Sequence, residues 1–355
     1  MVKVRLGLIA FANDGGLGAQ TRRLAQMLKP DRIMVVDSSG FSRNKEQHFE
    51  WYKDFNYFVV NGFPNNDDVK KFLPGLTHVL AVENPYNFGL VYWGQKMGIK
   101  ILVQSNYEFC DNLDKPWLPV PDLFLMPSHW KVREMRELYQ DRVKMLPPPI
   151  DPKEFAKARS INLYRKAKKR RFLHVIGTAA MEDRNGTLDL LEAVKLSKAD
   201  FELVIKTQHP LSMNVFLDDP RVTYEIDNVK DNNDLYSEFD VLLLPRRWGG
   251  LSLTMDEAMM SALPVLTTDI SPNNDWLPKE WLVESVAKRK FIARSSITCY
   301  SVDHKKYADK IDEFANMSVV DMAFHKGRAY GLAARTFSPK ELKRKYLFLL
   351  HNRES

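Results

Sequence analysis

The stretch Val241–Trp276, VLLLPRRWGGLSLTMDEAMMSALPVLTTDISPNNDW, decides the fold class. Val241–Leu244 is a short apolar run closed by a proline, which is typical of a buried strand. A basic, glycine-containing loop follows over Arg246–Gly250, and Leu253–Ser261 has the pattern of a short helix. A second apolar run, Val265–Thr268, comes next. Strand, loop, helix and strand in this order are the unit of a parallel α/β sheet, and the loop lies at the carboxyl end of a strand, where such sheets bind ligands.

The amino-terminal half repeats this alternation of apolar runs and helical patterns. Strands are predicted at Val2–Ala12, Arg32–Val36, Tyr57–Val60, His78–Val82, Ile101–Gln104 and Leu123–Met126, and helices at Ala19–Leu28, Asp67–Phe72 and Gly89–Met97. Alternating elements of this kind predict a doubly wound parallel sheet.

Size and composition allow two domains. The chain has 355 residues, of which 45% are hydrophobic, with 20 Phe and 7 Trp, enough for two cores. The net charge of +7 is compatible with an anionic partner. The phosphates of a nucleotide are the simplest anionic partner. Nucleic acid or an anionic membrane surface are partners that would need further support.

Cysteine usage and hydropathy favour a cytoplasmic protein. Cys110 and Cys299 are the only cysteines, so we expect neither a disulfide framework nor a cysteine-rich metal site. Lys3 and Arg5 interrupt the first apolar run, which speaks against a signal peptide. The sequence has no apolar run of about 18 residues, so we expect no transmembrane segment; peripheral membrane contact stays open.

A glycine-rich loop, Asn13–Gly18, lies between the first predicted strand and helix. Gly16 and Gly18 would let backbone N–H groups approach an anion at the helix start. A plain tight turn explains the same residues equally well.

Two further loops after strands carry polar residues. Glu83 follows the strand that ends at Val82, and Asn106 and Glu108 follow the next strand. A carboxylate here could serve as a base toward an acceptor hydroxyl. Capping a helix or satisfying loop backbone is the alternative role for each of them.

The segment GGLSLTMDEAMMSALPV resembles the donor signature E-G-F-G-L-x-x-x-E-A-M-A-x-G-x-P-V of GT-B glycosyltransferases, in particular the retaining family 4. The segments PRRWGG and DISPNNDWLP also resemble divergent, phage-encoded members of this family. The resemblance implies two Rossmann-like, doubly wound parallel-sheet domains that face a cleft. It implies that Glu257 binds the ribose hydroxyls of a sugar nucleotide. Gly249 stands where the family has its first glutamate, a departure that affects the expected donor-sugar contacts.

The resemblance also predicts where the diphosphate of the donor is held. The family uses an Arg and a Lys after the first strand of the second domain, and here Thr178 replaces one of them. A basic side chain is needed because charge develops on the leaving oxygen. The candidates at strand ends on one predicted rim are Arg184, Lys206, Arg246 and Arg247. We expect two of these four to contact the diphosphate.

The resemblance assigns the remaining site residues. Donor-binding candidates are Gly16, Gly18, Asn228, Val229, Arg246, Arg247, Gly249, Gly250, Leu251, Ser252, Leu253 and Glu257, and catalytic candidates are Arg184, Lys206, Glu108 and Asn106. Asn228 and Val229 would flank the nucleotide base. We expect no catalytic metal and no cofactor beyond the sugar nucleotide, with UDP-sugar as the first choice.

Domain boundaries follow from the same comparison. Val143–Phe155, with three consecutive prolines, resembles the family segment that joins the domains, which places the boundary near Ile150. Residues 1–150 would form the acceptor-side domain and 151–335 the nucleotide-sugar domain. A closing helix over 336–355 would cross back to the first domain, with Ser338 as its N-cap. Six charges in seven residues, Arg165–Arg171, form either a solvated edge or a contact for an anionic acceptor.

These observations predict a hexosyl- or pentosyltransferase that moves a sugar from a nucleotide-diphosphate sugar to an acceptor hydroxyl, with retention. The acceptor could be a hydroxymethylated DNA base of a phage, a virion protein or a glycan, with the enzyme acting in the host cytoplasm if it is phage-encoded. Three alternatives stay open: a catalytically degenerate sugar-nucleotide-binding module, a UDP-sugar epimerase and a phosphorylase.

Overall fold

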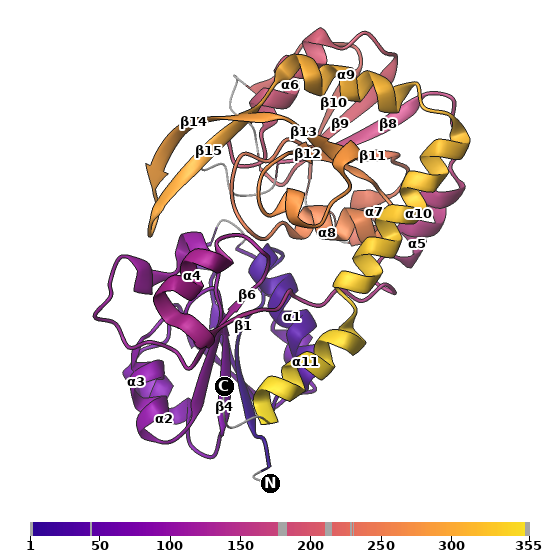
Figure 1. The fold of residues 1–355 in the computed structure, drawn as a ribbon. Coiled ribbons are helices and arrows are strands. Elements are labelled where there is room, and N and C mark those ends of the chain that lie inside the picture. Colours follow the sequence, from indigo (N-terminus) through magenta and orange to yellow (C-terminus); the bar gives the residue numbers. More distant parts are fainter. Residues whose placement is uncertain are drawn as a thin grey trace. The chain divides into compact units, whose positions relative to one another are not determined.

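The computed structural model describes residues 3–42, 45–176, 183–209, 215–227, 229 and 231–351. The chain divides into two compact units, each built on its own parallel sheet (Figure 1). The first unit comprises Met1–Pro149, Ala293–Ser295 and Pro339–Ser355. The second unit comprises Ile150–Ile292 and Ser296–Ser338.

The sheet of the first unit is parallel throughout, with seven strands among the described residues in the order β3-β2-β1-β4-β5-β6-β7. Its strands are β1 (Leu6–Phe11), β2 (Arg32–Asp37), β3 (Tyr57–Asn61), β4 (His78–Val82), β5 (Lys100–Gln104), β6 (Leu123–Met126) and β7 (Val143–Met145). The strand order reverses direction between β1 and β4. In open α/β sheets this switch point is where a crevice forms outside the carboxyl ends of the strands.

Helices cover both faces of this sheet. They are α1 (Gly16–Leu28), α2 (Asn66–Phe72), α3 (Gly89–Lys96), α4 (Val132–Tyr139) and α11 (Pro339–His351). Successive strand residues point to opposite faces, so Leu8 and Ala10 pack with α1 and α11, whereas Ile9 and Phe11 pack with α2 and α3. Both faces of the strands are therefore buried, which explains why they read as continuous apolar runs.

The second unit repeats the plan with a parallel sheet in the order β10-β9-β8-β11-β12-β13. Its strands are β8 (Arg170–Val175), β9 (Phe201–Thr207), β10 (Val222–Ile226), β11 (Val241–Leu244), β12 (Val265–Thr268) and β13 (Leu282–Val283), and an antiparallel hairpin is formed by β14 (Ser285–Ile292) and β15 (Ser296–Val302). The switch point of this sheet lies between β8 and β11.

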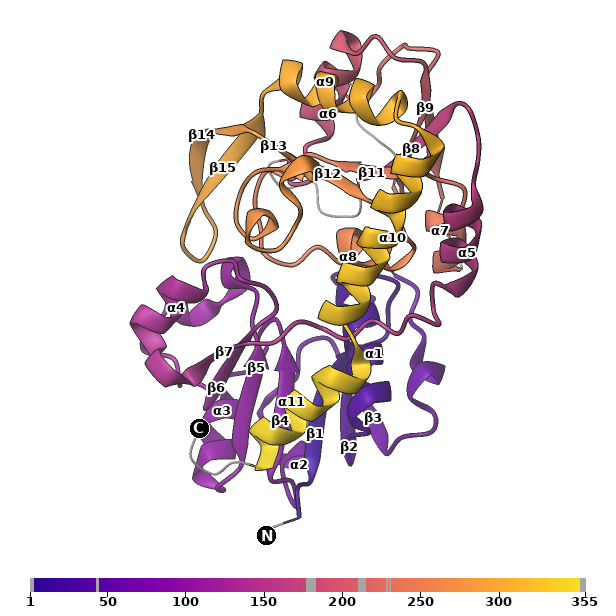
Figure 2. The ribbon, with the colours of Figure 1, turned by 45° about the vertical axis from the view of Figure 1, so that its right-hand side comes forward.

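The helices of the second unit are α5 (Ala156–Tyr164), α6 (Thr187–Leu196), α7 (Asn232–Tyr236), α8 (Leu253–Met260), α9 (His304–Ala315) and α10 (Val319–Thr336). α6 packs beside α9, and α8 packs beside α10 (Figure 2). Within the described residues, no helix combines the length and the apolar character that crossing a bilayer requires.

Most elements agree with the sequence predictions, and a few differ. The strand expected over residues 2–12 is shorter, because pairing with β4 begins at Leu6. The sequence predictions did not include β7, the β14–β15 hairpin, or the helices α5, α9 and α10.

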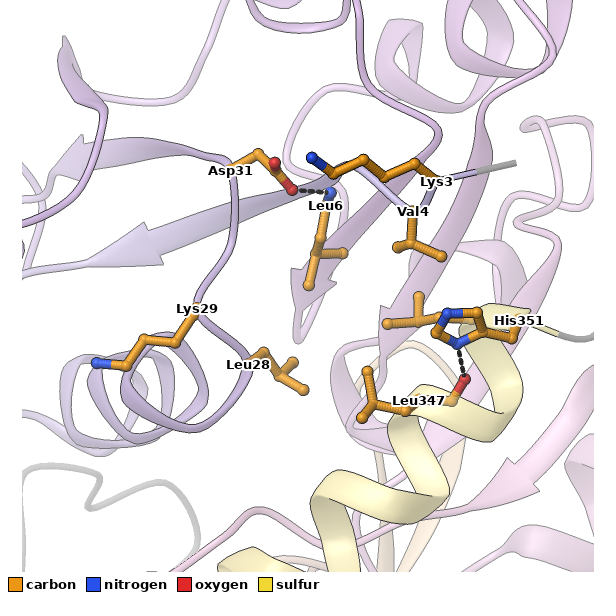
Figure 3. A pocket seen from close by; sticks show the side chains of 9 residues that line it. Lys3, Val4, Leu6, Leu28, Lys29, Asp31, Leu347 and His351 are labelled. Atoms are coloured by element: carbon orange, nitrogen blue, oxygen red, sulfur yellow. Dashed lines mark hydrogen bonds between the residues drawn. The ribbon is translucent and has the colours of Figure 1, made fainter. Parts of the chain in front are cut away.

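A cavity of about 360 Å³ lies in the first unit between the amino end of β1 and the last turns of α11 (Figure 3). Val4, Leu6, Leu28, Leu347 and Leu350 supply its apolar lining. Because it lies at the amino ends of the strands, it is separate from the edge where parallel sheets bind ligands.

Candidate functional site

The candidate site is built at the switch point of the second sheet, from the loops that follow β8 and β11. The backbone N–H of Arg247 donates to the carbonyl oxygen of Arg184 at 2.9 Å, which joins the two loops. Gly186 permits a closer approach still: a Cβ added there would lie 2.0 Å from the carbonyl oxygen of Pro245. Its φ of +72° is also one that glycine adopts readily. The two loops are therefore held together by backbone contacts that tolerate no side chain at Gly186.

Two guanidinium groups converge on Gly249 in the second of these loops. A Cβ added to Gly249 would lie 2.8 Å from Nε and Nη2 of Arg184 and 2.8 Å from Nη2 of Arg246. Arg246 is buried, and it donates from Nε to the carbonyl of Trp248 at 3.1 Å and from Nη2 to that of Leu251 at 2.6 Å. Both guanidinium groups stay charged at all ordinary pH values. Because like charges at this separation repel, the loop favours an anionic ligand.

Trp248 fixes the direction of Arg184. The Cζ atom of Arg184 lies 4.4 Å from the centre of the Trp248 ring, within the range of a cation–π interaction. Phe291 of β14 contacts the ring edge-on, with centroids 4.9 Å apart. Trp248 is only 1% exposed, and its Nε1–H has no hydrogen-bond partner among the residues that the structure describes. Such a buried donor is costly unless a ligand or water oxygen satisfies it.

Helix α8 completes the site. Ser252 occupies its N-cap position without a side-chain capping bond. The first backbone N–H groups of a helix lack intrahelical partners and favour an anion. Further along α8, Glu257 is buried, and its Oε2 accepts a hydrogen bond of 2.9 Å from the hydroxyl of Tyr236.

Comparisons with known proteins agree with this geometry. Residues 170–301 match the family model described as glycosyl transferases group 1. Among solved structures, a glycosyltransferase from Rickettsia africae is similar, with a TM-score of 0.70 and 15% identity over 100% of both chains. The HepE protein of Anabaena, in complex with UDP and glucose, has a TM-score of 0.69 and 10% identity, over 98% of this chain and 99% of that one.

A third similar structure is the sucrose-phosphate synthase of Thermosynechococcus elongatus, with a TM-score of 0.62 and 13% identity over 98% of each chain. The fold is GT-B. By sequence, no curated protein matches the chain. Identities of 10–15% show the fold alone. The family match and the GT-B fold together support a GT-B glycosyltransferase.

Of the four basic candidates in this GT-B chain, the structure brings Arg184 and Arg246 together and turns the other two side chains elsewhere. Arg247 donates from Nε to the carbonyl of Tyr300 at 2.9 Å and lies 3.8 Å from Asp189. Lys206 pairs with Glu225 on the neighbouring strand β10 at 3.2 Å, and its Nζ donates to the carbonyl of Asp234 at 3.1 Å. Lys206 and Arg247 thus lie near the carboxyl ends of β9 and β11, but their side chains contact protein groups; contact of two of the four residues with the diphosphate stays a prediction.

Residues 249–252 lie in the loop between β11 and α8, and Leu253 is the first residue of α8. This group contains the donor-binding candidates Gly249, Gly250, Leu251, Ser252 and Leu253. Asn228 lies outside the described residues, and Val229 is a half-buried residue beyond the end of β10.

In the first unit, Gly18 has a structural role. A Cβ there would lie 1.8 Å from the carbonyl oxygen of Asn13, so packing within the turn requires glycine. Gly16 is the first residue of α1. Of the two interpretations of this loop, the geometry of Gly18 favours the tight turn.

The polar candidates after β4 and β5 divide into two environments. Asn106 donates from Nδ2 to Oε1 of Glu83 at 3.5 Å, and both residues are half-buried. Glu108 lies in the short 3-10 helix Tyr107–Phe109 and is buried. Glu83 is thus the more accessible of the two carboxylates.

The basic run Arg165–Arg171 is largely paired within the second unit. Arg165 and Arg170 contact Asp240 at 3.3 and 4.0 Å, and Arg171 pairs with Glu238 at 3.1 Å. Lys169 pairs with Asp200 at 2.7 Å, whereas Lys166 and Lys168 are exposed, so a contact of this run with an anionic acceptor stays a prediction.

Sequence reasoning did not select Trp248, Phe291, Tyr236 or Asp189 as site residues. Trp248 could have been found from the sequence, because a Trp followed by two glycines in a strand-to-helix loop is unusual enough to mark a site residue. The others act through tertiary contacts that are far apart in sequence.

The structure also groups Asp14, Glu46 and His48, whose potential ligand atoms all lie within 4.8 Å of one another. Partial burial lowers the pKa of His48, but the hydrogen bond to Asp14 and the nearby carboxylates outweigh it and raise the pKa overall. A raised pKa favours imidazolium, which pairs with these carboxylates.

Proposed function

We propose that the chain transfers a sugar from a UDP-sugar to the hydroxyl group of an acceptor, with retention of the anomeric configuration. The observation that carries the proposal is the convergence of Arg184 and Arg246 on Gly249, at the switch point between β8 and β11. UDP as the nucleotide is supported by the HepE structure, which holds UDP and glucose. Retention is supported by the resemblance of the surrounding segment to the retaining family 4.

The proposed chemistry needs a stabilised leaving group. The bond between the anomeric carbon and the β-phosphate oxygen breaks, and a bond from that carbon to the acceptor oxygen forms. The acceptor proton passes to the departing phosphate. Negative charge develops on that phosphate, and the guanidinium groups of Arg184 and Arg246 would donate charge-assisted hydrogen bonds to it. Trp248 would hold Arg184 in place, since ordered donors need no rearrangement during the reaction.

Titration calorimetry with UDP, UMP and uridine tests the diphosphate site. UDP should bind more tightly than uridine, and Arg246→Gln should weaken UDP binding by about 10–100-fold, because a hydrogen bond to a charged group contributes about 1.5–3 kcal/mol. Uridine affinity should not change in this variant. Arg133→Gln is the matched control, since Arg133 lies on α4 of the first unit with its side chain 90% exposed. Equal affinities of the wild-type protein for UDP and uridine would overturn the assignment.

Transfer and its stereochemistry need a separate measurement. NMR of the anomeric proton in the first minutes of reaction should show a product with the configuration of the donor. Inversion would contradict retention. A UDP-sugar that binds but is neither transferred nor hydrolysed would instead identify a sugar-nucleotide-binding module.

A further inference from the structure

Four aromatic rings form a continuous series along the carboxyl edge of the first sheet. Phe11 ends β1, and Phe41, Phe63 and Tyr86 lie in the loops that follow β2, β3 and β4. Ring centroids are 5.1 Å apart for Phe11 and Tyr86, 5.5 Å for Tyr86 and Phe63, and 4.4 Å for Phe63 and Phe41. The inner end is buried in the core, whereas Phe63 and Phe41 are 54% and 48% exposed. The series therefore leads from the core to an ordered aromatic surface.

The exposed rings are held in a defined orientation. Phe63 is nearly parallel to Tyr86, with an interplanar angle of 9°, and Phe41 stacks on Phe63 at 29°. The hydroxyl of Tyr86 donates to the carbonyl of Val82 at 2.8 Å. Asn87 donates to the carbonyl of Pro64 at 3.1 Å, which links the loop after β4 to the loop that carries Phe63. A platform of this kind can bind a flat apolar surface without first being ordered.

The loop after β4 adds polar groups beside the rings. Glu83 and Tyr86 have φ values of +70° and +60°, a backbone conformation that is strained for residues other than glycine. Burial raises the pKa of Tyr86, and the charge of Glu83 and a hydrogen bond with it raise the pKa further. The phenol thus stays a donor beside a carboxylate acceptor, and Asn106 contacts the same carboxylate. Donors and acceptors of hydrogen bonds therefore lie beside Tyr86, the ring on which Phe63 stacks.

Charge at this edge decides between classes of ligand. Asp37 ends β2, and the loops after β1, β2 and β4 carry the carboxylates Asp14, Glu46 and Glu83 together with the basic side chains of Lys45 and His48. His48 pairs with Asp14 at 3.1 Å, but carboxylates still outnumber the basic side chains among the described residues of this edge. Although the whole chain has a charge of +7, this local excess of carboxylates would repel the phosphates of a nucleic acid. A neutral pyranose suits the edge, because its apolar C–H face packs on the negative face of an aromatic ring and its hydroxyl groups donate to carboxylates.

We propose that Phe41 and Phe63 form the platform of an acceptor site for a neutral sugar residue of a glycan, with Glu83 accepting hydrogen bonds from its hydroxyl groups. The role of this site as an acceptor site rests on the proposed function. The binding of a sugar to the two rings does not depend on it. The inference names a substrate class that the diphosphate site leaves open.

The test is an array of neutral oligosaccharides that end in glucose, galactose, mannose or N-acetylglucosamine, probed with labelled full-length protein in the presence of UDP. The wild-type protein should be retained on at least one sugar, and Phe63→Ala should lose at least tenfold in affinity. Phe63→Trp should keep binding, because it keeps a ring. Phe348→Ala is the matched control, since Phe348 is also exposed, at 65%, but lies on α11.

The outcomes separate this inference from the proposed function. Retention of no sugar, or wild-type binding by Phe63→Ala, would overturn the acceptor site. Binding of a 20-nucleotide oligothymidylate that depends on Phe63, with no sugar bound, would overturn it in favour of nucleic acid. UDP affinity, measured by calorimetry on the same proteins, should not change in Phe63→Ala. If the wild-type protein binds sugars but no nucleotide, the proposed function fails while the sugar site stands.

Discussion

Replacing Gly249 with alanine tests whether the space beside the two guanidinium groups is required. The new Cβ would lie 2.8 Å from atoms of Arg184 and Arg246, whereas ordinary van der Waals contact begins at 3.4 Å. The guanidinium groups would therefore have to move by about 0.6 Å if they alone gave way. Because Arg246 is tied to two carbonyl groups of its own loop, we expect most of this movement to fall on Arg184.

The structure sets the size of two separate effects. A φ of +102° strains any residue with a Cβ, at a cost of about 1–3 kcal/mol, or a melting temperature lower by about 2–12 °C. A hydrogen bond of about 2.9 Å lengthened by 0.6 Å leaves the usual range of about 2.7–3.2 Å. Loss of one guanidinium–phosphate bond costs about 1.5–3 kcal/mol, so UDP should bind about 10–100-fold more weakly.

Calorimetry with UDP and thermal unfolding, carried out on the same variant, measure the two effects. Gly98→Ala is the matched control: Gly98 has a φ of +71°, and a Cβ there would meet nothing within 4 Å. It should lower stability through strain alone and leave UDP affinity unchanged. If Gly249→Ala binds UDP as tightly as Gly98→Ala does, the guanidinium groups do not hold the diphosphate in this geometry.

Three further predictions follow from buried groups. Asp240→Ala should lower the free energy of unfolding by about 3–5 kcal/mol, because it leaves Lys326 buried and unpaired; adding Lys326→Met should recover part of the loss in chemical denaturation. Burial lowers the pKa of His174 to about 4, below its unfolded value of 6.5, so stability should fall as the pH drops from 6.5 to 4, by about 3 kcal/mol at most, and His174→Gln should show a flatter pH profile of unfolding. Tyr236→Phe removes the donor to Glu257 and should weaken nucleotide binding several-fold in calorimetry; unchanged affinity would separate this carboxylate from the ligand.

The sheets could be predicted from the sequence because their strands are buried on both faces. The run Val241–Leu244 and the strand His78–Val82 have in the structure the bounds that the sequence predicted. The hairpin could not be found in this way. Strand β14, Ser285–Ile292, is mostly exposed and carries three consecutive basic residues, so it has no apolar periodicity.

The candidate site was predictable in its location but not in its geometry. A basic, glycine-containing loop at a strand end is visible in the sequence, and the parallel-sheet rule places it near the switch point. Which basic side chains meet there depends on the approach of Gly186 to Pro245 and on the partners that Lys206 finds on β10. Those contacts join segments that are distant in sequence, which periodicity and spacing do not report.

The adjacent residues Arg246 and Arg247 show why sequence alone could not choose between them. Hydrogen bonding of Arg247 to the carbonyl of Tyr300 ties the loop to β15, and Arg246 is left beside Gly249. A glutamate at position 249, where the retaining family has one, would place its Cβ against two guanidinium groups. Glycine at this position therefore leaves the space into which the two guanidinium groups project. Gly249→Glu should then disrupt the site, because both guanidinium groups would have to move away from the new side chain.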